Sequence, residues 1–280
     1  MKRFFFLTLG IISCSIIPHS LSAQVFLGSA TVRCKYEMSY KEDVTSREYK
    51  NDLIYLDIGR EASHCYSIYA YYRDSVQSAL LNKGIGGMAV GAQTSELRRG
   101  VEYVMAKQYK SRTLSVSDIV MVGHYVYNEP IPAIDWQITQ ETSTILSYPC
   151  RKATAQFRGR SWIAWFTTEI PLSEGPWQFG GLPGLILQLE DTQKHYIIAA
   201  TGIEQLAPAV AMQFKTVDLG GKAYKKVNRE QLAKLKREFY TNMEQYMRDY
   251  HGVISITTYD SDGSLMEPIP SQPYNPIELE

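Results

Sequence analysis

The sequence lacks the compact motifs of common catalytic and metal sites. Its histidines form no HxH, HxxxH or HExxH pattern, and there is no GxSxG turn to carry a nucleophilic serine. The glycine-rich residues 83–94 match neither GxxxxGK followed by Ser or Thr nor GxGxxG, so we expect a flexible surface loop there. These absences disfavour a zinc site, an α/β-hydrolase and a nucleotide-binding fold. We predict no catalytic residue, no cofactor and no metal.

An excess of charge is also absent, because 29 Lys and Arg residues balance 29 Asp and Glu residues. A nearly neutral chain is not drawn electrostatically to nucleic acid or to an anionic lipid surface, so we expect no nucleic-acid partner. Beyond the N-terminus, no apolar run approaches the roughly 20 residues that a membrane-spanning helix needs. We therefore do not expect a transmembrane protein.

Cysteine is scarce, with four copies. Cys14 lies in a loose match to a lipoprotein cleavage site, and acylation there would tether the mature protein to a membrane. The residues after it remain apolar, however, which favours an ordinary secretory signal over lipidation. The other three, Cys34, Cys65 and Cys150, allow at most one internal disulfide, and their spacing does not indicate which pair. We favour buried cysteines that act as small hydrophobic residues.

The first 23 residues are typical of a cleaved secretory signal. Lys2 and Arg3 precede an apolar run at 4–17, and a short stretch of small residues ends at Ala23. The apolar run is too short to span a membrane. We expect cleavage between Ala23 and Gln24, and an exported protein in the periplasm or associated with the outer membrane.

Period-two alternation of apolar and polar residues predicts strands at 25–40, 52–58 and 151–157. A short helix is expected at 74–82. Further strands are expected at 64–72, 101–109, 112–117, 119–127, 134–139, 143–148, 161–169, 185–190 and 195–203. Short strands with close turn signals favour a curved antiparallel sheet or half-barrel over βαβ units, so the fold class is mainly β (α+β).

One long amphipathic helix is predicted at 229–250, with Asn228 as N-cap in a capping box with Gln231 and with Gly252 just beyond the C-terminus. We expect its apolar stripe to pack on the sheet. A last strand is predicted at 253–259. The sequence thus indicates a single β-rich domain over 24–266, followed by a Pro-rich tail at 267–280 that we expect to be extended and poorly ordered.

The most distinctive stretch runs from Tyr148 to Leu187 and includes Arg158-Gly159-Arg160, Gly175-Pro176-Trp177 and the run Gly181 to Ile186. This stretch resembles the GLPGLI family of exported Gram-negative envelope proteins. Further matches at 56–59, 66–67 and 136–138 extend the resemblance over roughly residues 25–205, while Cys65 departs from the aromatic residue of many relatives.

The resemblance implies an exported β-rich protein with no established activity. Some relatives accompany outer-membrane uptake systems, and the strand pattern is similar to the half-barrels of lipoprotein carriers. Fold similarity alone does not fix function.

The glycines and prolines of this stretch predict a rigid, shaped connection between two strands over 175–184. The residues expected to form this structural motif are Cys150, Gly159, Gly175, Pro176, Gly181, Leu182, Pro183 and Gly184. Trp177 either caps the core or joins a cleft for an apolar ligand. The candidate ligand-binding residues are Trp136, Trp165, Trp177 and Phe179. Trp162 and Trp165 should face opposite sides of their strand.

The first functional hypothesis is a non-enzymatic envelope protein that binds an apolar ligand, a lipid or an outer-membrane partner. The alternative is an uncharacterised periplasmic hydrolase, and a third hypothesis is a structural accessory subunit of an outer-membrane complex. Paired carboxylates could carry acid/base chemistry if they converged. The carboxylates near the motif are instead expected at the solvated surface; they are Glu169, Glu174, Glu190 and Asp191.

Overall fold

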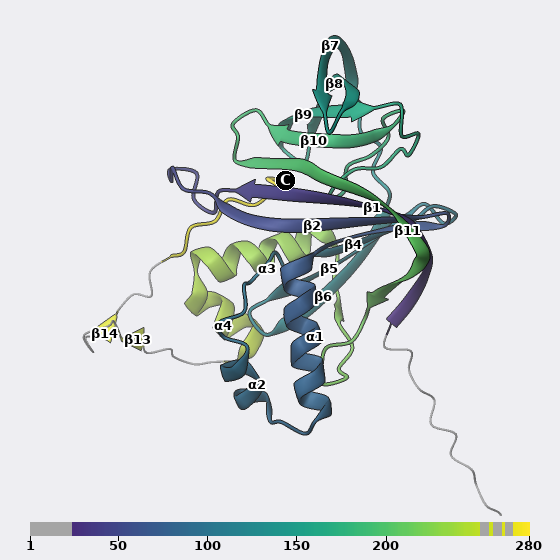
Figure 1. Ribbon diagram of the computed structural model, residues 1–280. Helices are drawn as coiled ribbons and strands as arrows, with labels where there is room; N and C mark the ends of the chain where they lie inside the picture. The colour runs from purple at the N-terminus through teal and green to yellow at the C-terminus, as the bar shows by residue number, and fades with distance from the viewer. Residues whose placement is uncertain (1–23, 253–257, 260–264, 267–270) are drawn as a thin grey trace, which may run out of the picture.

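A twelve-stranded sheet dominates the computed structural model (Figure 1), which describes residues 24–252, 258–259, 265–266 and 271–280. The strands are β1 (Gln24–Tyr40), β2 (Lys50–Gly59), β3 (Ala62–Ser67), β4 (Val104–Gln108), β5 (Thr113–Val120), β6 (Gly123–Pro130), β7 (Gln137–Ile145), β8 (Tyr148–Phe157), β9 (Arg160–Thr167), β10 (Leu185–Asp191), β11 (Tyr196–Lys215) and β12 (Lys225–Lys226), with a separate pair β13 (Thr258–Tyr259) and β14 (Leu265–Met266). The helices are α1 (Ile68–Asn82), α2 (Gly87–Gln93), α3 (Arg229–Thr241) and α4 (Met243–His251).

The strands follow the order β12-β6-β5-β4-β3-β2-β1-β11-β10-β9-β8-β7. Neighbours are antiparallel except for the two-residue β12, which runs parallel to β6. The predicted fold class, a mainly β protein with a curved antiparallel sheet and a late helical element, is therefore confirmed. Within the described residues, no helix is long and apolar enough to cross a membrane.

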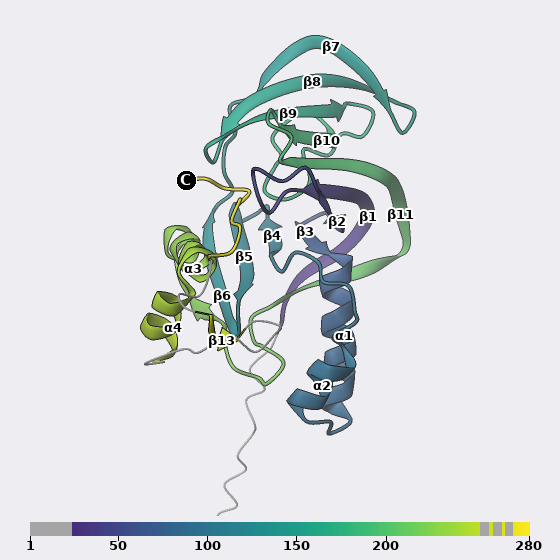
Figure 2. The same cartoon turned by 90° about the vertical axis from the view of Figure 1, so that its left-hand side faces the viewer.

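The bend of the sheet comes from its two longest strands, β1 and β11. Their antiparallel register shifts between Phe26 and Gly28, between Ala30 and Val32, and between Lys35 and Tyr36. The first and last shifts insert one extra residue, and at the middle shift β11 advances five residues against two of β1. Such insertions bend a strand and increase its twist. Figure 2 shows the result, an arch of strands that leaves one side open, where α3 and the C-terminal end of the chain lie.

The inner face of the arch carries the larger of two hydrophobic clusters. Alternate residues of β1, Cys34, Tyr36 and Met38, point into it, as period-two burial predicts. The register shift after Ala30 turns that residue to the other face of the sheet. There it joins a second, smaller cluster, which consists of Leu27, Ala30, Ala62, Ala106, Met212 and Phe214. Strand β3 is consequently buried on both faces.

The predicted long C-terminal helix is broken into α3 and α4 at Asn242. The backbone there is not helical, with φ −151° and ψ 71°, and the side chain caps α4 by accepting a hydrogen bond from Gln245 N. The predicted capping box of Asn228 and Gln231 is confirmed, as is the left-handed Gly252 at the C-terminus of α4. The apolar stripe of α3 buries Leu232 and Leu235 in the larger cluster.

Two early predictions are wrong. The strand predicted at 64–72 ends at Ser67, because this serine caps α1 by accepting a hydrogen bond from Ala70 N. The helix therefore starts six residues before the predicted position. The glycine-rich residues 83–94, expected to form a flexible loop, contain α2. Of the last strand predicted at 253–259, the structure describes only β13, and the remaining residues lie outside the described part.

Candidate functional site

Residues 168–184, which join β9 to β10, close the inner face of the sheet and include most of the distinctive motif. A buried ion pair fixes them, because Lys107 Nζ of β4 lies 2.8 Å from the Glu174 carboxylate. The same ammonium donates a hydrogen bond of 2.5 Å to the carbonyl of Phe179. Glu174 was expected in solvent, and that expectation is wrong. These contacts hold the segment as an inner layer against the sheet.

One position of the motif can only be glycine, because the neighbouring backbone leaves no room for a side chain. Gly184 has φ +156°, and a Cβ placed on it would lie 2.0 Å from the carbonyl oxygen of Thr167. No other residue fits so close to a neighbouring backbone. Around it, Gly175, Pro176 and Leu182 are buried, whereas Gly181 and Pro183 are exposed, and Cys150 is buried in β8.

The motif places two aromatic side chains in the core. Trp177 is 2% exposed and Phe179 is fully buried, with ring centroids 5.3 Å apart. Trp136 joins them, since its ring centroid lies 6.0 Å from that of Phe179 and its Nε1 donates to Gly180 O at 2.9 Å. Trp162 packs on Phe179 at 4.8 Å. These rings fill the space between them.

Trp165 lies apart from this cluster. It sits opposite Lys152 and Gln188 in the ladder and is half-buried, whereas Trp162 is fully buried on the inner face. The expectation that Trp162 and Trp165 face opposite sides is confirmed. Of the four aromatic residues proposed as ligand-binding, the structure brings Trp136, Trp177 and Phe179 together. Trp165 lies outside this group of rings, half-buried, although it packs against the larger cluster.

A buried polar site surrounds Arg160, the first residue of β9. Its guanidinium forms an ion pair with Asp191, with Nη1 and Oδ2 2.9 Å apart, and both side chains are 2% exposed. The guanidinium also lies over the ring of Tyr196, 5.1 Å from its centroid. Asp191 in turn accepts a hydrogen bond from Tyr196 N. Asp191 was expected in a solvated turn, and its burial corrects that expectation.

Arg160 uses its other donors to hold the C-terminal residues 271–280, which we call the tail. Nη2 donates to the side-chain oxygen of Asn275 and to the carbonyl of Pro276, both at 2.6 Å, and Nε donates to the carbonyl of Ile277 at 3.1 Å. The described tail residues form no helix or strand, and they are packed into the protein instead of being poorly ordered. Buried donors of the core thereby satisfy the hydrogen-bond acceptors of the tail backbone. Residues 267–270, the start of the tail predicted at 267–280, lie outside the described part.

A second contact holds the carboxylate of Glu278. It accepts a hydrogen bond of 2.7 Å from Gln178 Nε2 and lies 3.7 Å from Arg158 Nε and 3.5 Å from Arg229 Nη1. Burial raises the pKa of Glu278, and the two arginines oppose this shift. The arrangement selects for a carboxylate at this point, because two guanidinium groups and an amide donor converge on it.

The backbone of the tail is held as well. Leu279 N donates to the carbonyl of Arg158 at 2.9 Å, and the hydroxyl of Tyr196 donates to the carbonyl of Asn275 at 2.5 Å. Gly159 allows this approach, since a Cβ there would lie 2.8 Å from Leu279 Cβ. Lys41 and Tyr240 also contact the tail through their carbonyl groups. We use the name tail-binding site for six of the contacting residues, Arg158, Gly159, Arg160, Gln178, Tyr196 and Arg229.

The sequence contains one signal for this site that the turn-based interpretation missed. Arg158-Gly159-Arg160 was interpreted only as a hairpin turn. Arg160 has the same parity along β9 as Trp162 and Phe166, which are fully buried. A charged residue on a buried face needs a partner, so the pattern already pointed to a buried carboxylate or carbonyl group.

The three cysteines of the described chain, Cys34, Cys65 and Cys150, are buried and free. Cys34 lies opposite Leu56, and Leu56 lies opposite Cys65, so the two cysteines are two strands apart. Strands lie about 4.8 Å apart, which places these Cα atoms beyond disulfide reach. Burial raises the pKa of both thiols to about 12. The expectation of cysteines that pack as small hydrophobic residues is confirmed.

His64 of β3 is buried, and its Nε2 has no hydrogen-bond partner. It was expected to be a surface residue or to have its hydrogen bonds satisfied. Burial lowers the pKa of His64 to about 4, and the nearby Asp57 acts in the opposite direction. The unfolded chain then binds a proton between about pH 6.5 and pH 4 that the folded protein does not bind. Stability from this group is complete above pH 6.5 and is lost as the pH falls through that window.

We expect acidification from pH 7.5 to pH 4 to cost the wild-type protein about 3 kcal/mol through this single group. The variant His64→Phe keeps a ring against Tyr66, whose centroid lies 4.8 Å away, and removes the titration. Urea unfolding at both pH values should show a smaller loss in the variant. An equal loss in both proteins would mean that His64 does not titrate as its burial requires.

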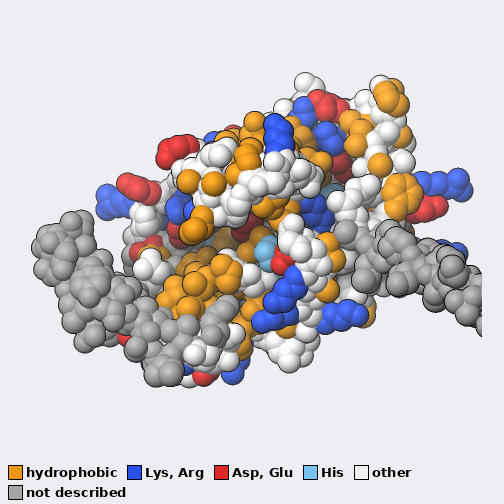
Figure 3. All heavy atoms as spheres, turned by 90° about the horizontal axis from the view of Figure 1, so that it is seen from below, with side chains coloured by type: hydrophobic (Ala, Val, Ile, Leu, Met, Phe, Trp, Pro, Cys, Tyr) orange, Lys and Arg blue, Asp and Glu red, His pale blue; other side chains and the backbone are white. Residues whose placement is uncertain are grey.

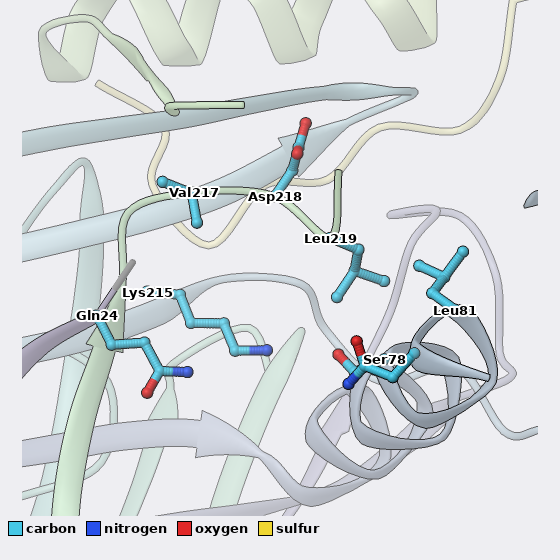
Figure 4. A pocket seen from close by; sticks show the side chains of 8 residues that line it. Gln24, Ser78, Leu81, Lys215, Val217, Asp218 and Leu219 are labelled. Atoms are coloured by element: carbon cyan, nitrogen blue, oxygen red, sulfur yellow. The ribbon is translucent and has the colours of Figure 1, made fainter. Parts of the chain in front are cut away.

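Two of the hollows on the described surface bear on the candidate site. The one in Figure 4, of about 170 Å³, lies between the start of β1, the end of β11 and α1, and Lys215 extends across it toward Ser78. Lys215 also forms an ion pair with Asp74. The other, of about 320 Å³, lies over Ala155 and Trp162 near the start of β7. Neither is lined by the four aromatic residues proposed as ligand-binding.

Hydrophobic side chains also gather on the surface, over the α3–α4 side of the molecule, in the view from below (Figure 3). Met121 and Val122, in the turn between β5 and β6, are 45% and 68% exposed. Among the described residues, no group of three or more His, Cys, Asp or Glu side chains could hold a metal ion.

Residues 158–188 match a family described as "Protein of unknown function (Porph_ging)". The match is short, but it contains the Gly181 to Ile186 run together with Arg158, Gly159, Arg160 and Gln178 of the tail-binding site. No curated protein matches the chain. Two crystal structures of PNGF-II, in space groups C2 and P21, are similar at TM-score 0.47, with 14% and 15% identity. Each alignment covers 74% of this chain, which spans only about a third of PNGF-II (32% and 33%).

Proposed function

We propose that this chain is an exported envelope protein, similar to the GLPGLI family, that acts as a non-enzymatic binding or accessory module. Its ligand is an extended segment of a partner polypeptide, such as an outer-membrane protein, and its site is the tail-binding site. One observation carries the proposal: the family-matched segment uses Arg158, Arg160 and Gln178 to hold an extended chain through its backbone and one carboxylate. Side chains arranged in this way recognise polypeptide.

The other hypotheses draw less support from the described residues. An apolar ligand or lipid needs an open apolar cleft, whereas Trp177 and Phe179 are closed in by neighbouring rings. A hydrolase needs polar groups that converge in an accessible cleft. The buried carboxylates Asp57, Asp118, Glu174 and Asp191 are each bound to a basic side chain instead. The buried Asp52 accepts hydrogen bonds from Ser67 Oγ and from the backbone N–H groups of Leu53 and Val101.

The proposal is tested on protein purified from the cell envelope. N-terminal sequencing should give Gln24 as the first residue, and an uncleaved chain in the cytoplasm would contradict export. Native mass spectrometry after lipid extraction should show no retained lipid. Cross-linking in intact cells, followed by mass spectrometry, should join an envelope polypeptide to residues 158–188. Retained lipid, or cross-links confined to other surfaces, would contradict a polypeptide site in this segment.

A further inference from the structure

We propose that the tail-binding site exchanges its own tail for a partner segment of the same chemistry, and that the tail is a built-in competitor. The segment is extended and carries Asn-Pro, then an apolar residue and a carboxylate, as residues 275–278 do. This inference rests on the proposed function and adds to it the recognised sequence and its regulation.

The first argument concerns what is recognised. Arg160 binds two consecutive carbonyl groups, those of Pro276 and Ile277, which any extended segment presents. Two side chains supply the specificity. The amide of Asn275 is held at both ends, because its oxygen accepts from Arg160 and its nitrogen donates to Lys41 O at 2.8 Å. The Glu278 carboxylate meets two arginines and Gln178.

The second argument concerns the site without the tail. Arg160 is held by Asp191 at 2.9 Å and lies against Tyr196, and neither of these residues belongs to the tail. Arg158 is likewise held by Glu129 of β6 at 2.7 Å. The donors therefore keep their positions when the tail leaves. Because the side chains of such a site are already ordered, the binding of a new segment costs little conformational entropy in the site.

The third argument concerns the tail itself. Residues 271–280 add no strand to the sheet, and residues 253–270 separate them from α4 in the sequence. The tail can therefore leave without breaking a strand ladder. A tethered segment acts at an effective concentration in the millimolar range, so it competes strongly with a free segment. A variant whose own tail binds more weakly should therefore bind a separate peptide segment more tightly at the tail-binding site.

The experiment measures binding of a fluorescent peptide, Ser-Gln-Pro-Tyr-Asn-Pro-Ile-Glu-Leu-Glu, to full-length protein by anisotropy. The wild-type protein is compared with Asn275→Ala/Glu278→Gln, whose own tail is weakened. We expect the double variant to bind the peptide at least about tenfold more tightly, because its tail competes less. Equal affinity for both proteins would overturn the exchange, provided that hydrogen exchange shows the variant tail to be released.

Changes in the peptide test the recognised chemistry without disturbing the protein. On the double variant, a peptide with Glu278→Gln or Asn275→Ala should bind about tenfold more weakly, and a scrambled peptide should not bind. Arg229→Met, added to the double variant, should weaken the parent peptide more than the peptide with Glu278→Gln, which keeps only the hydrogen bond from Arg229 to the carbonyl of Glu280. Peptides that all bind alike would contradict the proposed chemistry.

The outcomes separate this inference from the proposed function. Cross-links at residues 158–188, together with equal peptide affinity for the wild-type protein and the double variant, would contradict tail exchange and leave the proposed partner site in place. Tight, sequence-dependent peptide binding, with cross-links confined to surfaces other than residues 158–188, would contradict the proposed function. Size-exclusion chromatography should show a monomer at the assay concentration. A dimer that the double variant fails to form would mean that a second copy, and not a partner, supplies the segment.

Discussion

The variant Arg160→Met is expected to lower the free energy of unfolding by about 3–5 kcal/mol, because it leaves the buried Asp191 carboxylate without its partner. The same change removes the three hydrogen bonds that hold Asn275, Pro276 and Ile277. Urea unfolding measures the loss. Hydrogen exchange should show that the tail amides lose their protection at the same time.

Arg151→Met is the matched control, because Arg151 lies on the adjacent β8 and is exposed. It should change stability by less than about 0.5 kcal/mol. The double variant Arg160→Met/Asp191→Leu removes both charges and should recover part of the lost stability. Recovery should be incomplete, because the backbone N–H of Tyr196 loses its acceptor and the tail stays released. If Arg160→Met were as stable as Arg151→Met, the buried network would not contribute as we describe.

The variant Trp177→Ala is expected to cost about 3–5 kcal/mol, because it empties the volume of a side chain that is 2% exposed. The indole packs against Trp162, Phe157 and Phe179, with ring centroids 5.3–6.4 Å away. Thermal and urea unfolding should both show the loss. The control Trp165→Ala, on the opposite face and only half-buried, should cost less.

The pair of tryptophan variants also decides between the two hypotheses made for Trp177. A large loss of stability supports a core residue that the motif positions. A Trp177→Ala protein with full stability that had lost its binding would instead support an aromatic ligand cleft. The positive φ of Trp177, +57°, adds to the first interpretation, because surrounding contacts must hold a residue in that conformation.

The sequence predicted those parts of the fold whose burial repeats regularly. Alternation in β1 and β8 was sufficient to locate these strands, although it could not show that the shift after Ala30 turns this residue away from the inner face. Caps were predictable where a capping residue preceded an amphipathic run, as at Asn228. Asn242 was missed because the apolar spacing continues across it, and only its backbone conformation reveals the break. Ser67 was missed for the same reason, at a junction of strand and helix.

The candidate site was less predictable, because it joins segments far apart in the sequence. The pairing of Arg160 with Asn275 spans 115 residues, and no local pattern indicates such a contact. Prolines and polar residues after Glu267 are typical of a poorly ordered tail, and composition cannot show that a buried arginine is aimed at their carbonyl groups. The parity of Arg160 with Trp162 was the one local sign of the site.

Hydrogen exchange of the tail amides in the full-length wild-type protein tests the central claim most directly. Leu279 N donates to Arg158 O, and Gln272 N donates to Tyr240 O, so both amides should exchange well below the rate of an unstructured peptide. Arg160→Met should return both to that rate, whereas Arg151→Met should not. Unprotected exchange of residues 272–279 in the wild-type protein would show that the motif does not hold the tail.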